Sequence, residues 1–179
     1  MPKIDDNPIR PAYIGIDPGT NGGIALLQDG LIPRVQYTAM PPTRRDILGC
    51  LDSILELIAE PAQHRIFCVI EKVWALPGQS APAMWNFGMG YGGLLMALDA
   101  MHIPFAEVTP QTWMKMYRLP PRTKKESKAK WKGRLRERAQ QEFPDLPIWQ
   151  EKQAVVKQNR ISDALLIARY CQKQFPIRR

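Results

Sequence analysis

Short apolar runs and longer helical repeats follow one another along this chain in a regular order. Three runs near the start, at 12–17, 24–28 and about 35–40, have strand length and are separated by Gly-containing turns, which predicts three consecutive β-strands. Apolar residues then recur at helical spacing from Ile47 to Ile58. Thr43 is a helix-capping residue type and Pro61 stops a helix, so these two residues bound the first predicted helix.

The remainder of the chain is predicted to alternate between strand and helix. The continuous apolar run at 66–70 is typical of a central strand that is buried on both faces. A helix over about 83–101, a strand over 105–108, a basic helix over about 127–143 and a last helix over about 160–174 follow it. This order predicts an α/β protein whose mixed sheet of about five strands is flanked by helices.

The length of 179 residues suits one domain with a sizeable core, which we place at 13–175 after a flexible lead, 1–12. The lead contains Asp5, Asp6 and several prolines, so it does not have the pattern of a signal or transit peptide. The cysteines Cys50, Cys68 and Cys171 lack metal-site spacing. We therefore expect reduced, buried thiols and a cytoplasmic setting.

Three acidic residues stand out by their positions. Asp17 ends the apolar run at 13–16 and Glu71 ends the run at 66–70, so both carboxylates are expected at the carboxyl edge of the sheet. Asp163 opens an apolar helical stretch, and we expect it on the first turn, where the helix dipole favours an acid. Alone, each acid has an ordinary interpretation as a turn, solvated or helix-start residue. Together they predict a carboxylate cage for Mg²⁺.

Positive charge is concentrated between residues 115 and 138. This stretch contains eleven Lys or Arg residues and only two acids, Glu126 and Glu137. Its net charge is +9, in a chain whose total is +8. Such a run can be a solvated helix face, but this local excess favours a surface that binds phosphates. Membrane attachment is disfavoured because no long apolar segment or lipidation signal accompanies the run. Taken together, the three acids and the basic run predict a metal-dependent nuclease.

Five motifs in order carry a family resemblance: Ile-Asp-Pro-Gly-Thr-Asn-Gly-Gly-Ile-Ala at 16–25, Ile-Glu-Lys-Val-Trp at 70–74, Phe-Gly-Met-Gly-Tyr-Gly-Gly at 87–93, Val-Thr-Pro-Gln-Thr-Trp-Met-Lys at 108–115 and Asp-Ala-Leu-Leu-Ile-Ala-Arg-Tyr at 163–170. The chain resembles the RuvC-like Holliday junction resolvases, most closely the phage and plant-chloroplast branch. The resemblance implies an RNase H-like fold and a homodimer that nicks four-way DNA junctions symmetrically. It also implies two Mg²⁺ or Mn²⁺ ions per active site, and a nucleoid-associated enzyme of a bacterial or phage-infected cell.

The chain departs from that family at the fourth metal-site residue. The family has an acid or His three or four positions before the last acid, where this sequence has Arg160 and Asn159. Asn159 is the better candidate, because its amide oxygen can bind a hard cation although it carries no charge. The predicted metal-binding and catalytic set is therefore Asp17, Glu71, Asp163 and Asn159. A junction-binding protein with weak or no cleavage, or another RNase H-like nuclease, remains an alternative.

Other residues are expected to contact DNA. A tryptophan such as Trp74 is more often a core residue, whereas the resemblance implies that it stacks on bases at the junction centre. Gly88, Gly90, Gly92 and Gly93 weaken their helix, which would be explained either by a dimer contact or by tight packing on the sheet. The full predicted DNA-binding set is Trp74, Lys115, Arg122, Lys124, Lys125, Lys128 and Lys132.

Overall fold

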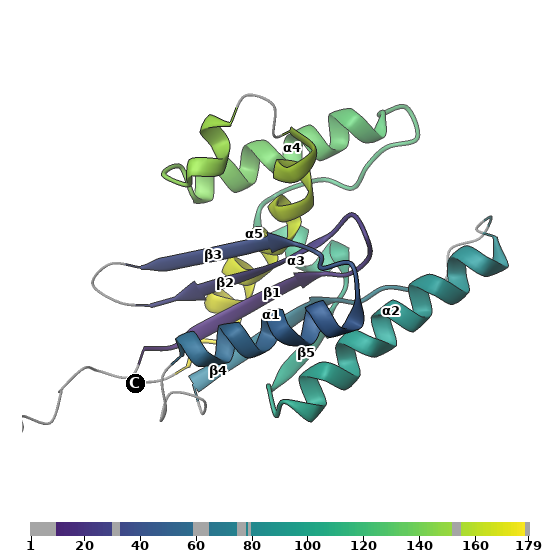
Figure 1. Ribbon diagram of the computed structural model, residues 1–179. Coiled ribbons are helices and arrows are strands. Elements are labelled where there is room, and N and C mark those ends of the chain that lie inside the picture. The colour runs from purple at the N-terminus through teal and green to yellow at the C-terminus, as the bar shows by residue number, and fades with distance from the viewer. Residues whose placement is uncertain are drawn as a thin grey trace, which may run out of the picture.

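The computed structural model describes residues 10–29, 33–58, 65–74, 78, 80–151 and 155–177. Five strands form one mixed sheet in the order β3-β2-β1-β4-β5 (Figure 1). The strands are β1 (Ala12–Asp17), β2 (Gly23–Gln28), β3 (Arg34–Ala39), β4 (Ile66–Glu71) and β5 (Phe105–Val108). The first three pair antiparallel, whereas β1, β4 and β5 run parallel. This is the RNase H-like arrangement, so the predicted fold class is confirmed.

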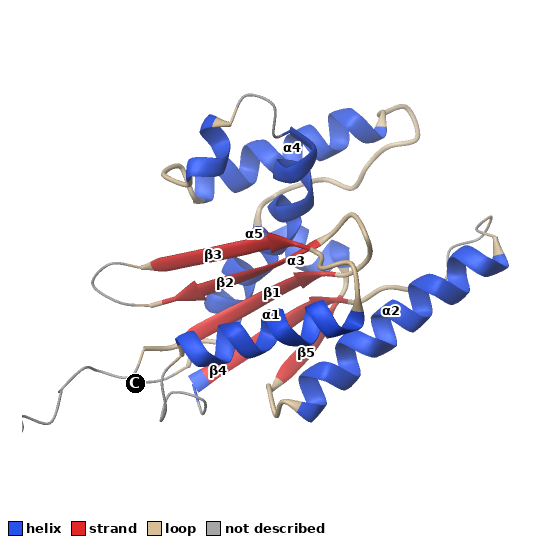
Figure 2. Ribbon diagram, in the orientation of Figure 1, coloured by secondary structure: helices blue, strands red, loops and turns tan. Residues whose placement is uncertain are grey.

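Helices cover both faces of the sheet (Figures 1 and 2). Helices α1 (Arg44–Leu57) and α2 (Ala81–Ala100) lie on one face, and α5 (Val155–Gln174) crosses the other. The short helix α3 (Pro110–Met116) and the basic helix α4 (Lys128–Glu142) both pack against α5. The sequence pattern did not predict α3 or the short 3₁₀ helix at Pro147–Gln150.

Hydroxyl side chains cap the starts of four helices. Thr43 Oγ1 accepts a hydrogen bond from the backbone N–H of Asp46 at 3.1 Å, as the sequence predicted for α1. The same interaction, with a residue three positions later, starts the other three helices, whose caps are Ser80, Thr109 and Ser127. Each cap satisfies one of the N–H groups that a helix leaves without an internal partner. Pro61, the predicted stop of the first helix, and residues 1–9 of the predicted lead lie outside the described residues.

Alternation along the strands separates two hydrophobic cores. In β1, Tyr13 belongs to the core under α5, and Ile14 belongs to the core under α1 and α2. In β4, Val69 faces the α5 core in the same way. Successive side chains of a strand point to opposite faces, so Asp17 and Glu71, at even offsets from Tyr13 and Val69, end their strands on the α5 side. The fold therefore presents both carboxylates to the same helix.

Gly15 sets how closely α5 can approach the sheet. A Cβ atom at this position would overlap the backbone N of Ala168 and the carbonyl O of Ala164, and it would lie 2.7 Å from the Cα of Ala168. The backbones of β1 and α5 are therefore in direct contact where Gly15 passes beneath the helix. Only glycine fits at such a crossing.

The start of α5 corrects one prediction. The helix begins at Val155, eight positions before Asp163, so the expected place of Asp163 on the first turn is wrong. Periodicity missed the early turns because Val155, Val156 and Lys157 are exposed and show no core-facing pattern. The dipole at the helix start therefore does not act on Asp163. Its environment comes from tertiary contacts.

The glycines of α2 correct a second interpretation. A Cβ atom added at Gly88, Gly90 or Gly92 would meet no atom within 4 Å, and at Gly93 it would approach only the Cδ of Arg44, at 3.9 Å. Tight packing on the sheet therefore does not explain these residues. Figure 1 shows the first half of α2 extending past the ends of the strands. The alternative, a contact with a second chain, stays a prediction.

The three cysteines carry free thiols. Cys68 and Cys171 are buried, Cys50 is half-buried, and all three are free, as expected of reduced thiols. Within the described ranges, no helix combines the length and the apolar character needed to cross a membrane.

The close crossing at Gly15 gives a stability prediction. Replacing Gly15 by Ala forces the two backbones apart, and we expect a loss of about 3 kcal/mol or more in the free energy of unfolding. Gly49→Ala, at an exposed position of α1, is the matched control. This variant should leave the free energy of unfolding unchanged or raise it by up to about 1 kcal/mol, because the added methyl group enters open space and alanine favours the helix. Urea unfolding followed by circular dichroism measures both. Similar stabilities for the two variants would contradict the role assigned to Gly15.

Candidate functional site

The structure brings the three predicted acids together. Asp17 and Glu71 end the neighbouring parallel strands β1 and β4, and Asp163 lies on α5 above them. Asp17 is only 9% exposed and Asp163 only 6%. Burial raises the pKa of Asp17 well above its ordinary value, and the negative charges of Asp163 and Glu71 raise it further. The cluster therefore concentrates negative charge in a poorly hydrated place.

Glu71 is held by an aromatic residue that sequence reasoning did not connect to the site. The indole Nε1 of Trp113 donates a 2.8 Å hydrogen bond to Glu71 Oε2. Trp113 is buried in α3, and Tyr117 at the end of that helix donates to the carbonyl O of Leu166 on α5 at 2.6 Å. Burial and the charge of Asp163 raise the pKa of Glu71 to about 7, whereas the indole N–H lowers it. Trp113 thus fixes one carboxylate oxygen and favours its ionised form.

A lysine lies among the three carboxylates. Lys132 Nζ donates to Asp163 Oδ2 at 2.6 Å, and its side chain is 25% exposed. Burial lowers the pKa of Lys132, but the charges of Asp163, Asp17 and Glu71 outweigh that effect and raise it. The ammonium is therefore charged and supplies positive charge to the acid cluster. The sequence placed Lys132 only in the DNA-binding set.

Helices α4 and α5 face each other through two matched polar pairs. Lys132 pairs with Asp163, and one turn along each helix Arg136 Nη1 donates to Asn159 Oδ1 at 3.2 Å. Residues four apart lie on one helix face, which Lys128, Lys132 and Arg136 share. A second basic row, at 130, 134 and 138, has the same spacing, so spacing alone does not single out the face directed toward α5. The amide oxygen of Asn159, the predicted fourth ligand, is thus engaged by an arginine.

A cleft of about 500 Å³ opens beside Asp17. The acid lies in a wall of residues from the β1–β2 turn, and the opposite walls contribute positive charge from α4 and α5. Arg160 Nη2 lies 3.5 Å from Asn21 Oδ1, and its Nε is buried without a hydrogen-bond partner among the described residues. The lining residues are Asp17, Pro18, Gly19, Thr20, Asn21, Gly22, Phe87, Lys128, Lys132, Val156, Asn159 and Arg160.

The donor set fits a hard divalent cation. Carboxylate oxygens are the ligands that Mg²⁺ prefers, and Asp163 Oδ1 is buried with no hydrogen-bond partner in the described part of the chain. As the described side chains stand, no group of three or more His, Cys, Asp or Glu is arranged to hold a metal ion. The Lys132 ammonium provides the counter-charge in this arrangement. Asp17, Glu71 and Asp163 are the residues that could hold a cation.

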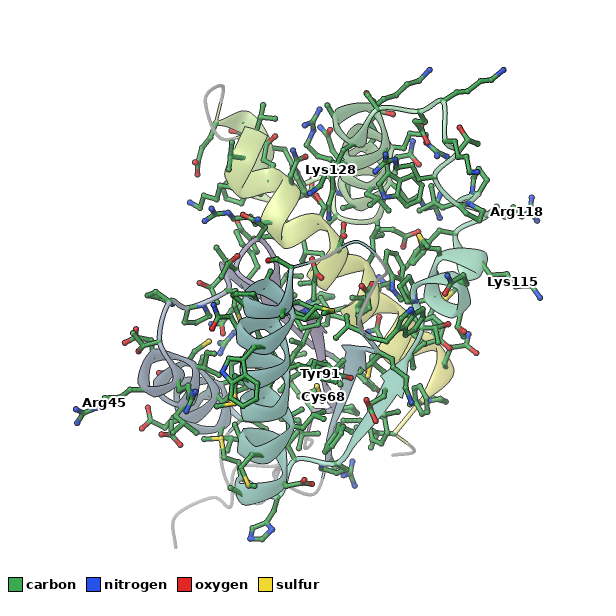
Figure 3. The ribbon with its side chains drawn as sticks, turned by 90° about the vertical axis from the view of Figure 1, so that its right-hand side faces the viewer. Arg45, Cys68, Tyr91, Lys115, Arg118 and Lys128 are labelled. Atoms are coloured by element: carbon green, nitrogen blue, oxygen red, sulfur yellow. The ribbon has the colours of Figure 1, made fainter. Side chains whose placement is uncertain are left out.

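The basic run divides into paired and exposed residues. Arg134 makes a two-pronged bond to Glu126 at 2.7 and 2.9 Å, and Arg138 pairs with Glu142 at 2.6 Å. Arg122 is exposed, and its Nε donates to the carbonyl O of Glu126 at 3.1 Å. Figure 3 shows Lys115 and Arg118 projecting outward from one side of the molecule, with Lys128 on α4 above them. The exposed Lys and Arg residues of the run without an ion pair in the described ranges are Lys115, Arg118, Arg122, Lys124, Lys125, Lys128 and Lys130.

Trp74 lies three residues beyond Glu71 and is 49% exposed. It is therefore not a core residue, and it follows the end of β4 at which Glu71 lies. Tryptophan is highly buried on average, so an indole exposed to this degree is available for contact with a ligand.

The strand order and pairing give the chain an RNase H-like fold, with Asp17 and Glu71 where β1 and β4 end. No protein-family model matches the chain, and no curated protein sequence matches it either. Among solved structures, it is similar to one titled T. thermophilus RuvC in complex with Holliday junction substrate, at 14% identity and a TM-score of 0.48, covering 92% of this chain and 96% of that one. The Thermus thermophilus RuvC structure is also similar, at 17% identity and a TM-score of 0.46, covering 89% and 92%.

The raised pKa of Glu71 predicts how stability depends on pH. In the unfolded chain Glu71 ionises near its ordinary value, whereas in the folded protein it ionises near about 7. Between these values the folded state holds more protons, so the stability of the metal-free protein falls as the pH rises from about 5 to about 8. Glu71→Gln should reduce that fall. The loss of stability is measured as the difference between the melting temperatures at the two pH values, with a chelator present to remove metal ions. Asp52→Asn, on the exposed side of α1, is the control. An equal drop in melting temperature in the wild type, Glu71→Gln and Asp52→Asn would exclude Glu71 as the cause.

Proposed function

We propose that this chain is a metal-dependent endodeoxyribonuclease that resolves four-way (Holliday) DNA junctions as a homodimer by symmetrical nicking. The observation that carries the proposal is the convergence of Asp17, Glu71 and Asp163 beside a cleft with basic walls. An acid cluster alone repels DNA, but here Lys128 and Arg160 line the same cleft and can hold phosphates near it. The sequence resemblance to the RuvC-like resolvases supports the choice of branched DNA and of a cytoplasmic, nucleoid-associated enzyme.

Each part of the site has a defined task in this proposal. Asp17, Glu71 and Asp163 would hold Mg²⁺ or Mn²⁺, two ions per site, with Asn159 as a weak, uncharged fourth ligand. Bound divalent ions lower the barrier to phosphodiester hydrolysis by neutralising charge on the attacking and leaving oxygens. Trp113 orients Glu71 through its indole N–H. The exposed lysines and arginines of the basic run position the DNA backbone.

Trp74 supplies selectivity for a branch point in this proposal. Base faces at a junction are less completely stacked than in continuous duplex, and aromatic stacking on an exposed base contributes about 1–3 kcal/mol. The exposure of Trp74 and its position three residues past Glu71 support this role. An indole there can read the branch while the acids act on a nearby phosphate.

The exposed face of α2 supports the homodimer. Trp85 and Met96 are each 69% exposed and Met89 is 41% exposed, and they follow one another at near-helical spacing. Gly88 and Gly92 lie between them with open space where a side chain would be. Large apolar side chains interleaved with glycines let another helix approach closely. A second copy of this chain fits the face, because two active sites are needed for two symmetrical nicks.

A second candidate function is junction binding without cleavage. It is favoured by the neutral Asn159, whose oxygen is bonded to Arg136, and by the lysine in the acid cluster. These features weaken a metal site but leave the DNA-binding surface intact. The cleavage assay below separates the two functions.

The central test is cleavage of a synthetic four-way junction by the wild type and by Asp17→Asn. The variant keeps the shape of the side chain but removes a metal ligand, so nicking should fall by about 100-fold or more, since even residues that only support metal ligands contribute 10–100-fold. Binding measured by gel shift should change by less than about twofold, because phosphate contacts do not need this ligand.

The same assay includes a matched linear duplex and an RNA–DNA hybrid. Preferential nicking of the junction supports resolution, whereas faster cutting of the hybrid identifies another RNase H-like nuclease. A wild-type protein that binds the junction tightly but never nicks it, with either Mg²⁺ or Mn²⁺, identifies the second candidate. Undiminished nicking by Asp17→Asn removes that residue from the site.

The exposed lysines predict the salt dependence of binding. If about six phosphates are neutralised, the log–log slope of affinity against salt is roughly −5, and each lost phosphate contact flattens it by about one unit. Lys124→Ala combined with Lys125→Ala should therefore flatten the slope by about two. Arg45→Ala is the control, because Arg45 is exposed on α1 and projects away from the basic run (Figure 3). Equal slopes for all proteins would show that Lys124 and Lys125 are only solvated.

The α2 face predicts where a charge disrupts the dimer. Met96→Asp places a carboxylate in the proposed interface and should weaken dimerisation by about 30-fold or more, the effect of losing a central interface residue. Leu48→Asp is the matched control, an exposed apolar residue on α1. Sedimentation velocity over a range of concentrations measures both. A wild type that stays monomeric at high concentration, or equal effects of the two changes, would exclude α2 as the interface.

A further inference from the structure

Lys132 contributes to the acid cluster from a different helix. It lies on α4, and its Nζ makes a 2.6 Å charged hydrogen bond to Asp163 Oδ2 on α5. Its charge also interacts with Asp17 and Glu71, so one ammonium serves three carboxylates that come from β1, β4 and α5. The exposed basic residues of the run have no such environment. Lys132 is therefore set apart from the neighbours with which it shares a sequence pattern.

Charge balance explains why a cation is needed at this place. Buried carboxylates that lie close together repel one another, and removing them from water without a counter-charge is costly. In the metal-free protein Lys132 provides that counter-charge. It leaves Asp163 Oδ1 buried with no partner in the described ranges, so the lysine satisfies only one oxygen of this carboxylate. A divalent cation has twice the charge and can bind several oxygens at once.

We infer that Lys132 is a built-in cation that competes with the divalent metal ion for the acid cluster, and that the ion must displace its ammonium from Asp163. The inference rests on the proposed function only in taking Asp17, Glu71 and Asp163 as the cation site. Lys132 is thus a positioning residue that keeps the carboxylates together when no ion is bound and limits the affinity of the protein for the ion.

The cleft indicates where the displaced ammonium goes. Lys132 lines the same cleft as Lys128 and Arg160, and a quarter of its side chain is exposed there. A DNA phosphate in this cleft is an alternative anionic partner for the flexible lysine side chain. Phosphate binding therefore draws Lys132 out of the acid cluster and opens it to the metal ion. By linkage the effect is reciprocal, so metal and DNA each strengthen the binding of the other.

Mn²⁺ binding to the protein without DNA tests the competition directly. Lys132→Met keeps the aliphatic stem and removes the charge, and it should bind Mn²⁺ about tenfold more tightly than the wild type, or tighter still. Lys130→Met is the matched control, since Lys130 is exposed on the same helix and should leave Mn²⁺ affinity unchanged. Lys132→Arg keeps the positive charge and should not gain affinity. Free Mn²⁺ is measured by electron paramagnetic resonance and the affinities are confirmed by calorimetry.

Thermal unfolding gives a second measure that does not depend on catalysis. Without metal, Lys132→Met should melt at a lower temperature than the wild type, and saturating Mn²⁺ should raise its melting temperature by more than that of the wild type. A variant too unstable to purify without metal is prepared in Mn²⁺, and Lys132→Gln, which keeps a polar end, is compared in the same way.

The outcomes separate this inference from the proposed function. Mn²⁺ affinity in Lys132→Met equal to or weaker than that of the wild type overturns the competition, even if the wild type resolves junctions. Tighter Mn²⁺ binding by Lys132→Met supports the competition, even if neither protein nicks DNA. Junction DNA should also raise Mn²⁺ affinity in the wild type by about tenfold and have less effect in Lys132→Met. An equal increase in both proteins would show that DNA does not act through Lys132.

Discussion

Helix α5 lies directly on strand β1, with the backbone of Ala164 and Ala168 where the side chain of residue 15 would otherwise be. This crossing fixes the depth of α5, and with it the depth of every residue the helix contributes to the site. Asp163 precedes Ala164 and is held next to the end of β1. A larger residue at position 15 would lift the helix and separate the acids, so the electrostatics of the site depend on a steric constraint at the centre of the sheet.

The acid cluster and the basic helix α4 form one electrostatic unit. The charges of Asp163 and Glu71 raise the pKa of Asp17, the charge of Asp163 raises the pKa of Glu71, and Lys132 offsets part of both effects. The two polar pairs between α4 and α5 also fix how the two helices face each other, because both pairs form only in one register. The basic run therefore has two parts: one face of α4 completes the acid cluster, and the exposed lysines and arginines lie outside it.

The sequence predicted the strands and the two strand-end acids well, because strand length, burial and Gly-Pro turns are local signals. Asp17 and Glu71 lie where the apolar runs end, as expected. The predicted start of α5 was wrong, because the exposed valines and the lysine of its first turn give no periodic signal. The bonds of Trp113 to Glu71 and of Lys132 to Asp163 join residues 42 and 31 positions apart. Such contacts depend on how α3 and α4 pack, which no single segment encodes.

The glycines of α2 also affect local unfolding of this helix in the monomer. Each glycine in a helix costs about 1 kcal/mol relative to alanine, and packing offsets none of this at Gly88, Gly90 and Gly92, where no atom lies within reach of a side chain. The helical hydrogen bonds in this part of α2 are therefore weakly protected, and their amide protons exchange with solvent well before those of the buried strands. If a second chain binds this face, as proposed above, it stabilises this segment, and assembly is then coupled to the local folding of α2.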